Sequence, residues 1–263
     1  MPRRLRRIRP ISHEDRLSVV EHLGELRMRL FVSLAAFVVA FSITGWKNHE
    51  VLEIVNKPLP DGVEPITLGP AEPFYTTITN SAYAALLIAL PVILYQVYAF
   101  VLPAFSPTER RVAFPLLLLI PVLFVAGVAF CYFVVLTPAI DFLYAFNADE
   151  FNTQLRAREY YSFATLLMLA MGLGFQIPVG ILAACRLGAL TPQQLRSGRR
   201  YAIVIIAVLA SLLPTIDPVT LLLEMVPLIV LYELSIVLAS AFGRPSAETA
   251  ERMAAAEGTQ PGS

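Results

Sequence analysis

The chain has 263 residues, of which 57% are hydrophobic and 15% are charged, whereas a soluble domain carries about 25% charged residues. Its formal net charge is zero, so the composition offers no bulk attraction to nucleic acid, and the low charge content excludes an ordinary soluble domain. The fold class is therefore decided by the uncharged runs, since crossing a bilayer takes roughly 20 apolar residues.

Six apolar segments follow one another and predict an all-α membrane protein with six transmembrane helices. They are residues 30–46, 73–108, 112–140, 160–185, 201–216 and 219–242. The fifth segment has only 16 residues, below the usual range of about 17–25. Glu224 and Glu233 interrupt the last segment. For these two reasons the fifth and sixth helices are both expected to be short. Prolines inside the spans indicate kinked helices and hence a concave bundle.

The basic residues are distributed unevenly between the two sides of the membrane. Sixteen of the twenty Lys and Arg residues lie in the N-terminal segment, in the loops before the third and fifth spans, and in the C-terminal tail. Cytoplasmic segments carry such an excess, so both termini are expected in the cytoplasm. The chain then divides into a basic cytoplasmic tail at 1–17, a membrane domain at 18–242 and a polar cytoplasmic tail at 243–263, which is expected to be disordered.

A helix signal lies just before the first span. Ser18 followed by Glu21 has the form of a capping box, and this helix is expected to lie along the cytoplasmic interface before it turns into the span. Glu25 lies on it among cationic neighbours. The carboxylate can pair with Arg29 one turn later, which is worth about 0.2–0.5 kcal/mol, or it can bind a partner that carries arginines.

The loops contain further helix signals. Residues 50–55 predict a short amphipathic helix in a proline-rich outer loop. In the inner loops, Ser106-Pro107-Thr108-Glu109 has the cap, the proline and the acidic residue of a helix start, and Thr191 is expected to cap another short helix. Cys131 and Cys185 fall near opposite faces of the membrane, so no disulfide and no metal cluster are expected.

Several motifs occur together in an order typical of one family. The segment His22-Leu-Gly-Glu-Leu-Arg27 resembles the HLxELRxRL signature of TatC, the large subunit of the twin-arginine protein translocase. The likeness continues through residues 91–103, 109–111, 132–135, 175–178 and 217–218. It covers roughly residues 18–242, nearly everything but the tails.

The resemblance implies a receptor and scaffold in the bacterial cytoplasmic (inner) membrane, and not an enzyme. TatC-like proteins bind folded cargo at the cytoplasmic face through a signal that bears two consecutive arginines. They form complexes with the single-span subunits TatA and TatB, and export is driven by the proton-motive force. A homo-oligomer within a Tat complex is expected, with the lipid bilayer as surroundings, and no cofactor or nucleic acid is implied.

The resemblance maps the recognition surface onto the N-terminal segment and the loop between the second and third spans. Glu25 and Glu109 are expected to form a clamp of two carboxylates for two arginines, because a planar guanidinium binds a carboxylate through two hydrogen bonds. The signal-binding set also contains His22, Arg27, Phe100 and Arg110. Arg27 is expected to orient Glu25 or to contact headgroups. Phe100 either contacts the apolar part of the signal or is an ordinary interfacial aromatic.

Four polar residues in or beside the spans form a second set, with structural or partner-contact roles: Gln176, Asp217, Thr220 and Glu224. TatC proteins often carry Glu at the position of Gln176, and a neutral amide cannot titrate, which argues against proton handling there. Asp217 is suited to capping the sixth helix. A carboxylate inside a membrane is a functional candidate. Glu224, with Thr220, either contacts a TatA- or TatB-type helix or is protonated and bonded within the bundle.

Two other classes of protein compete with this interpretation. A secondary transporter or channel with a midplane solute site is the main alternative, but it predicts internal symmetry that the chain does not display. An intramembrane hydrolase needs a nucleophile with its base. The sequence contains neither an HExxH zinc helix nor a GxSxG elbow.

Overall fold

The computed structural model describes residues 13–101, 107–146, 148–150, 153–186, 188–212 and 217–242, and side chains at 13–21, 107–117 and 242 lie outside the described set. The elements in chain order are α1 (His13–Trp46), α2 (Asn48–Asn56), α3 (Glu72–Val101), α4 (Pro107–Phe130), the π-helix η2 (Cys131–Leu136), α5 (Thr137–Ala145), α6 (Ala157–Gly174), α7 (Ile177–Arg186), α8 (Pro192–Ser197), α9 (Arg199–Ser211) and α10 (Pro218–Phe242). Of the two predicted tails, only residues 13–17 fall within the described part, and they are helical.

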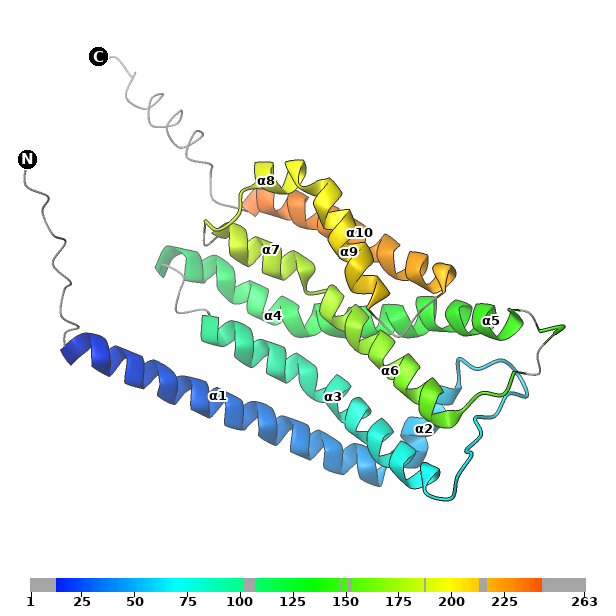
Figure 1. Cartoon of the computed structure of the whole chain (residues 1–263). Coiled ribbons are helices and arrows are strands. Elements are labelled where there is room, and N and C mark those ends of the chain that lie inside the picture. Colours follow the sequence, from blue (N-terminus) through cyan, green and yellow to red (C-terminus); the bar gives the residue numbers. More distant parts are fainter. Residues whose placement is uncertain are drawn as a thin grey trace, which may run out of the picture.

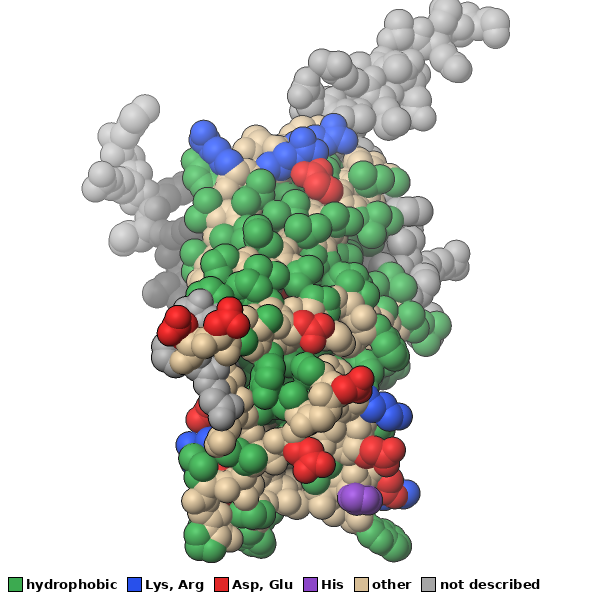
Figure 2. Space-filling model, turned by 90° about the vertical axis from the view of Figure 1, so that its right-hand side faces the viewer, with side chains coloured by type: hydrophobic (Ala, Val, Ile, Leu, Met, Phe, Trp, Pro, Cys, Tyr) green, Lys and Arg blue, Asp and Glu red, His purple; other side chains and the backbone are tan. Residues whose placement is uncertain are grey.

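Five segments are long and apolar enough to cross a membrane. They are His22–Trp46, Glu72–Val101, Leu118–Ala145, Ala157–Arg186 and Pro218–Ala241. Hydrophobic side chains cover much of the face shown in Figure 2, as expected for a protein surrounded by lipid. These features confirm the predicted all-α membrane fold.

The fifth and sixth spans differ from each other in length. The fifth is α9, whose 13 residues rise about 20 Å, less than the roughly 30 Å of the hydrocarbon core. It is short, as predicted. The sixth, α10, is longer than expected at 25 residues, because neither Glu224 nor Glu233 ends the helix.

The first helix is a single unbroken element of 34 residues. It begins at His13, five residues before the predicted start at Ser18, since the residues between them include no glycine or proline that would stop a helix. The expected turn between an interfacial helix and the first span is also wrong, because α1 continues straight through Gly24 to Trp46.

The long helices pack in two groups (Figure 1). α1 packs along α3, α3 packs along α4 and α6, and α4 packs along α6. In the second group α10 contacts α7, α8 and α9, and contacts of α4 with α7 join the two groups. Figure 1 shows α1 on one side of the bundle and α8 to α10 on the other.

Small residues allow α4 and α6 to approach closely where they cross. A Cβ atom on Gly127 would lie 2.7 Å from the backbone oxygen of Met171 and 2.9 Å from the Cα atom of Gly172. A Cβ atom on Gly172 would in turn lie 2.6 Å from the ring of Phe124. Helix pairs in membranes use such small residues because close van der Waals packing holds them together.

Irregular geometry occurs next to two prolines. η2 directly precedes the turn containing Pro138, whose ring excludes the regular hydrogen bond to the carbonyl four residues earlier. The fourth span breaks between α6 and α7, at Phe175 and Gln176, just before Pro178. Pro91 and Pro227, in contrast, lie inside uninterrupted helices.

At the end of the bundle away from the N-terminus of α1, two loops are joined by what we call the loop clasp. The backbone N–H of Ile66 donates to the carbonyl of Leu155, and that of Ala157 donates to the carbonyl of Ile66, both at 2.8 Å. Nε of Arg156 donates to the carboxylate of Glu72 at 2.7 Å, and this hydrogen bond raises the pKa of the Arg156 guanidinium. The clasp therefore ties the loop before α3 to the start of α6.

Candidate functional site

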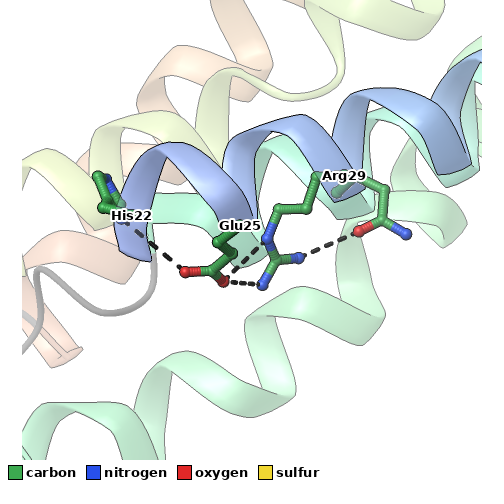
Figure 3. A network of polar contacts seen from close by, with 4 residues as sticks. His22, Glu25 and Arg29 are labelled. Atoms are coloured by element: carbon green, nitrogen blue, oxygen red, sulfur yellow. Dashed lines mark hydrogen bonds and ion pairs between the residues drawn. The ribbon is translucent and has the colours of Figure 1, made fainter. Parts of the chain in front are cut away.

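Three side chains on one side of α1 form a polar cluster around Glu25 (Figure 3). Nε and Nη2 of Arg29 both donate hydrogen bonds to the Oε1 atom of Glu25, at 3.0 and 2.6 Å. On the other side, Nδ1 of His22 lies 3.9 Å from the Oε2 atom. Spacings of three and four residues bring side chains together on adjacent helical turns, so the local pair that the sequence allows is formed.

The cluster extends from α1 to the C-terminal end of α3. Nη1 of Arg29 donates a hydrogen bond to the side-chain oxygen of Gln96, 67 residues away in sequence, at 3.0 Å. One turn further along α3, the ring of Phe100 stacks on His22 with centroids 4.3 Å apart and an angle of 15° between the planes. Packing of α1 along α3 thus fixes both ends of the cluster. We call these five residues the Glu25 cluster.

The Glu25 carboxylate is placed to accept a second cation. Its side chain is 37% exposed. Arg29 engages only one of its two oxygens, and His22 is beyond hydrogen-bond distance of the other. Because an ionised carboxylate has about four lone-pair sites, an arriving guanidinium can bind the second oxygen or replace Arg29.

Arg27 lies on a different part of the helix surface from the Glu25 cluster. It is exposed, and its guanidinium lies over the ring of Phe31, 5.6 Å from the ring centroid. The contact with Glu25 that the sequence suggests for Arg27 is made by Arg29, because residues four apart share a helix face and residues two apart do not.

Glu109 and Arg110 belong to the first turn of α4, which begins at Pro107 as predicted. Their side chains lie outside the described set, so only their backbone is placed. α3 ends one residue after Phe100, and α4 begins six residues later. The start of α4 therefore lies at the same end of the bundle as the Glu25 cluster.

Gln176 ties the break between α6 and α7 to a neighbouring helix. The residue is 7% exposed. Its amide nitrogen donates to the carbonyl of Ile120 in α4 at 3.2 Å and to the carbonyl of Gly172 at 3.5 Å. These contacts require a donor, which an ionised glutamate at this position could not supply.

Asp217 caps α10. Its Oδ1 atom accepts a hydrogen bond from the backbone N–H of Thr220 at 2.7 Å, and its carbonyl accepts from Leu221 at 3.1 Å. The capping role considered for Asp217 is thereby confirmed. Thr220 and Glu224 follow on the same side of α10, and neither has any exposed surface. Contact with a second chain would require α10 to separate from its neighbours, so their burial favours a role within the bundle.

Two members of the Glu25 cluster were not in the predicted set. Arg29 entered the sequence argument only as a competing local partner, and Gln96 did not enter it. A polar residue one turn before Phe100 on the same helix face was the available signal. Within the described residues, no three His, Cys, Asp or Glu side chains are grouped so as to hold a metal ion.

Comparisons with known proteins match nearly the whole chain to proteins of one kind. The family model described as "Sec-independent protein translocase protein (TatC)" matches residues 21–227. The TatC protein of Aquifex aeolicus (strain VF5) is 38% identical over 228 residues, covering 84% of this chain and 94% of that protein. The TatC protein of Escherichia coli (strain K12) is 35% identical over 230 residues, covering 86% and 89%.

The fold gives the same result. A solved structure described as a crystal structure of the twin-arginine translocase receptor TatC matches with a TM-score of 0.74 at 38% identity. That match covers 85% of this chain and 100% of the solved chain. Sequence and fold agree over the same long stretch, and this chain belongs to the TatC family of Sec-independent protein translocase proteins.

Proposed function

We propose that this chain is the signal-receptor and scaffold subunit of a twin-arginine translocase in a bacterial cytoplasmic membrane. Its family, its several membrane-spanning helices and the receptor named in the matching crystal structure support this function. The main alternative, a transporter or channel with a midplane solute site, finds no support in these comparisons.

The observation that carries the proposal is the half-exposed carboxylate of Glu25, held by Arg29 through a single oxygen. Arg29 is itself fixed to Gln96, so the carboxylate has a defined orientation while its second oxygen remains available to a ligand. A guanidinium from a signal peptide that replaces Arg29 can bind both oxygens through its planar fork, which a lysine ammonium cannot do.

Glu109 is proposed as the second carboxylate for the second arginine of the signal. Its backbone lies at the same end of the bundle as Glu25. Phe100 and His22 form a stacked pair beside Glu25, suited to the apolar residues that follow the arginines. Arg27 and Arg110 are proposed to border the signal and to contact lipid headgroups.

The proposed orientation has both termini in the cytoplasm, as the distribution of Lys and Arg supports. It places the Glu25 cluster on the side where folded cargo arrives. TatA-type and TatB-type single-span subunits are the proposed partners, in a complex that contains several copies of this chain and uses the proton-motive force. The hydrogen bonds of Gln176 support a structural role for that residue in such a complex.

Photocrosslinking tests the receptor assignment. A photoreactive residue replaces Met28, which is exposed one turn from Glu25, or Thr108, next to Glu109, so that both carboxylates are retained. Signal peptides with Arg-Arg are expected to label both positions more strongly than peptides with Lys-Lys. Phe74, exposed at the other end of α3, is the control position and should remain unlabelled. Equal labelling by the two peptides would exclude the receptor role of this surface.

A further inference from the structure

Four arginines gather where α7 ends and α8 and α9 meet. Arg186 lies in the last turn of α7, Arg196 lies in the last turn of α8, and Arg199 and Arg200 open α9. α10 packs against all three helices. Figure 2 shows Lys and Arg side chains gathered beside one carboxylate at the top of the view, where Figure 1 places α8. We call these four residues the basic platform.

α8, which carries Arg196 of the platform, is firmly attached to the bundle. Thr191 and Gln194 form both halves of a capping box at the start of α8, with hydrogen bonds of 3.2 and 2.9 Å. The hydroxyl of Tyr232 in α10 donates to the carbonyl of Leu195 at 2.9 Å. A ligand at the platform therefore meets arginines on a fixed support.

Three of the four arginines project from one nearly continuous helical path. Backbone hydrogen bonds continue across Gly198, from its own N–H to Gln194 and from Ala202 to its carbonyl. Arg196 and Arg200 are four residues apart and exposed, so they lie on the same face of this path.

One carboxylate limits the positive charge of the platform. Nη2 of Arg199 lies 2.7 Å from Glu233 of α10, which leaves the other three arginines without a carboxylate partner among the ion pairs of the described residues. The Nε atom of Arg186 is buried and has no hydrogen-bond acceptor in the described part of the chain. A buried donor of this kind needs an acceptor, which a ligand at the platform can supply.

The residue next to the platform is typical of the headgroup region of a membrane. Tyr201 follows Arg200 directly, is 60% exposed and begins the apolar run of α9, and exposed tyrosines at helix ends mark the membrane interface. Arg200 lies over the Tyr201 ring, 4.8 Å from its centroid. A span as short as α9 is accommodated by a locally thinner bilayer.

We infer that the basic platform is a binding site for the phosphate group of an anionic phospholipid. Arg196 and Arg200 contact the phosphate oxygens from the exposed side, and the guanidinium of Arg186, a residue that is only partly buried, supplies a further donor. Arg199 is withheld from the ligand by Glu233. The inference does not depend on signal recognition by the Glu25 cluster, which lies on α1 and α3.

The test uses the purified full-length chain with equal amounts of phosphatidylglycerol and phosphatidylcholine, and native mass spectrometry reports the ratio of the two bound lipids. The unaltered chain should prefer phosphatidylglycerol. Replacing Arg196→Gln and Arg200→Gln together should reduce this preference by about fivefold per arginine. Glu233→Gln frees Arg199 and should raise the preference by about fivefold. Arg158→Gln, which removes a charge from an exposed site in the first turn of α6, is the matched control and should change nothing.

The opposite directions of these variants separate lipid binding from damage to the fold, and their unfolding temperatures are measured in parallel. An unchanged lipid ratio in both the arginine double variant and Glu233→Gln would overturn the inference. Displacement of phosphatidylglycerol by an equal concentration of inorganic phosphate would also overturn it, because the site would then recognise phosphate and not a lipid.

Discussion

At the scale of single residues, the ion pair between Glu25 and Arg29 is weak enough to be exchanged. Helical pairs at this spacing contribute about 0.3–0.5 kcal/mol, and an arriving guanidinium would form hydrogen bonds of the same charge-assisted kind with the carboxylate. An arriving guanidinium can therefore replace Arg29 at small cost. Arg29 then keeps its hydrogen bond to Gln96, so its side chain stays close to Glu25 and can pair with it again when the ligand leaves.

Neutralising the carboxylate should weaken signal binding without unfolding the protein. Glu25→Gln is expected to reduce the affinity for an Arg-Arg signal peptide about ten- to hundredfold, because a charge-assisted hydrogen bond is lost. Fluorescence titration with a labelled peptide measures the effect. Glu53→Gln, an exposed change on α2, should leave the affinity unaltered. The same affinity in both variants would contradict the assignment.

The Glu25 cluster shows which site residues can be predicted from sequence. Glu25, His22 and Phe100 belong to recognisable motifs, and the local partner Arg29 follows from helical spacing. Gln96 could not be predicted, because its contact with Arg29 depends on how α1 and α3 are aligned, and no local pattern records that alignment.

At the scale of helices, boundaries follow local chemistry where a cap or a proline is present. α4 starts at Pro107 and α8 follows the Thr191 cap, both as predicted. The start of α1 was misplaced because a capping sequence inside a run of helix-compatible residues need not begin the helix. The length of α10 was underestimated because buried Glu224 does not interrupt its backbone hydrogen bonds.

Removing the cap of α10 should destabilise the protein moderately. Asp217→Ala is expected to cost about 0.5–2 kcal/mol, because the backbone N–H of Thr220 loses its acceptor. Asp217→Asn retains an acceptor oxygen and should change stability by a few tenths of a kcal/mol at most. Thermal unfolding in detergent compares the two, and equal losses would show that the charge and not the cap is important.

The crossing of α4 and α6 should not tolerate even one added methyl group. In Gly127→Ala the new Cβ atom would collide with the backbone of α6 at Met171 and Gly172, so we expect a loss of about 1–3 kcal/mol. Gly45→Ala in α1, where nothing lies within 4 Å, should be neutral or stabilising by up to about 1 kcal/mol. Unfolding measurements that rank the two variants in the reverse order would refute close packing at this crossing.

At the scale of the whole molecule, the class of fold could be predicted but the connections between loops could not. Length and apolarity of the segments are enough to place spans in a bilayer. The loop clasp joins residues about 90 positions apart, such as Ile66 and Leu155, and irregular loops carry no periodic pattern from which such pairing could be inferred.

Breaking the ion pair of the loop clasp should loosen both loops together. Arg156→Met removes the partner of the Glu72 carboxylate, whose side chain is only 9% exposed. Hydrogen exchange should then accelerate at the amides of Ile66 and Ala157, which form the backbone contacts of the clasp. Lys57→Met, in the same loop, serves as the comparison and should leave these two amides protected. Unchanged exchange in Arg156→Met would mean that the backbone contacts are sufficient.

The unbroken length of α1 sets a distance between cargo and lipid. Its 34 residues rise about 51 Å, against a hydrocarbon core of roughly 30 Å. Measured along the axis, Glu25 lies about 31 Å from Trp46. On the N-terminal side of Glu25 the helix extends a further distance of about 18 Å, or about 12 residues, to His13. In the proposed orientation this projecting part acts as a spacer. A folded domain too bulky to approach the bilayer can remain in water while a short extended segment reaches Glu25.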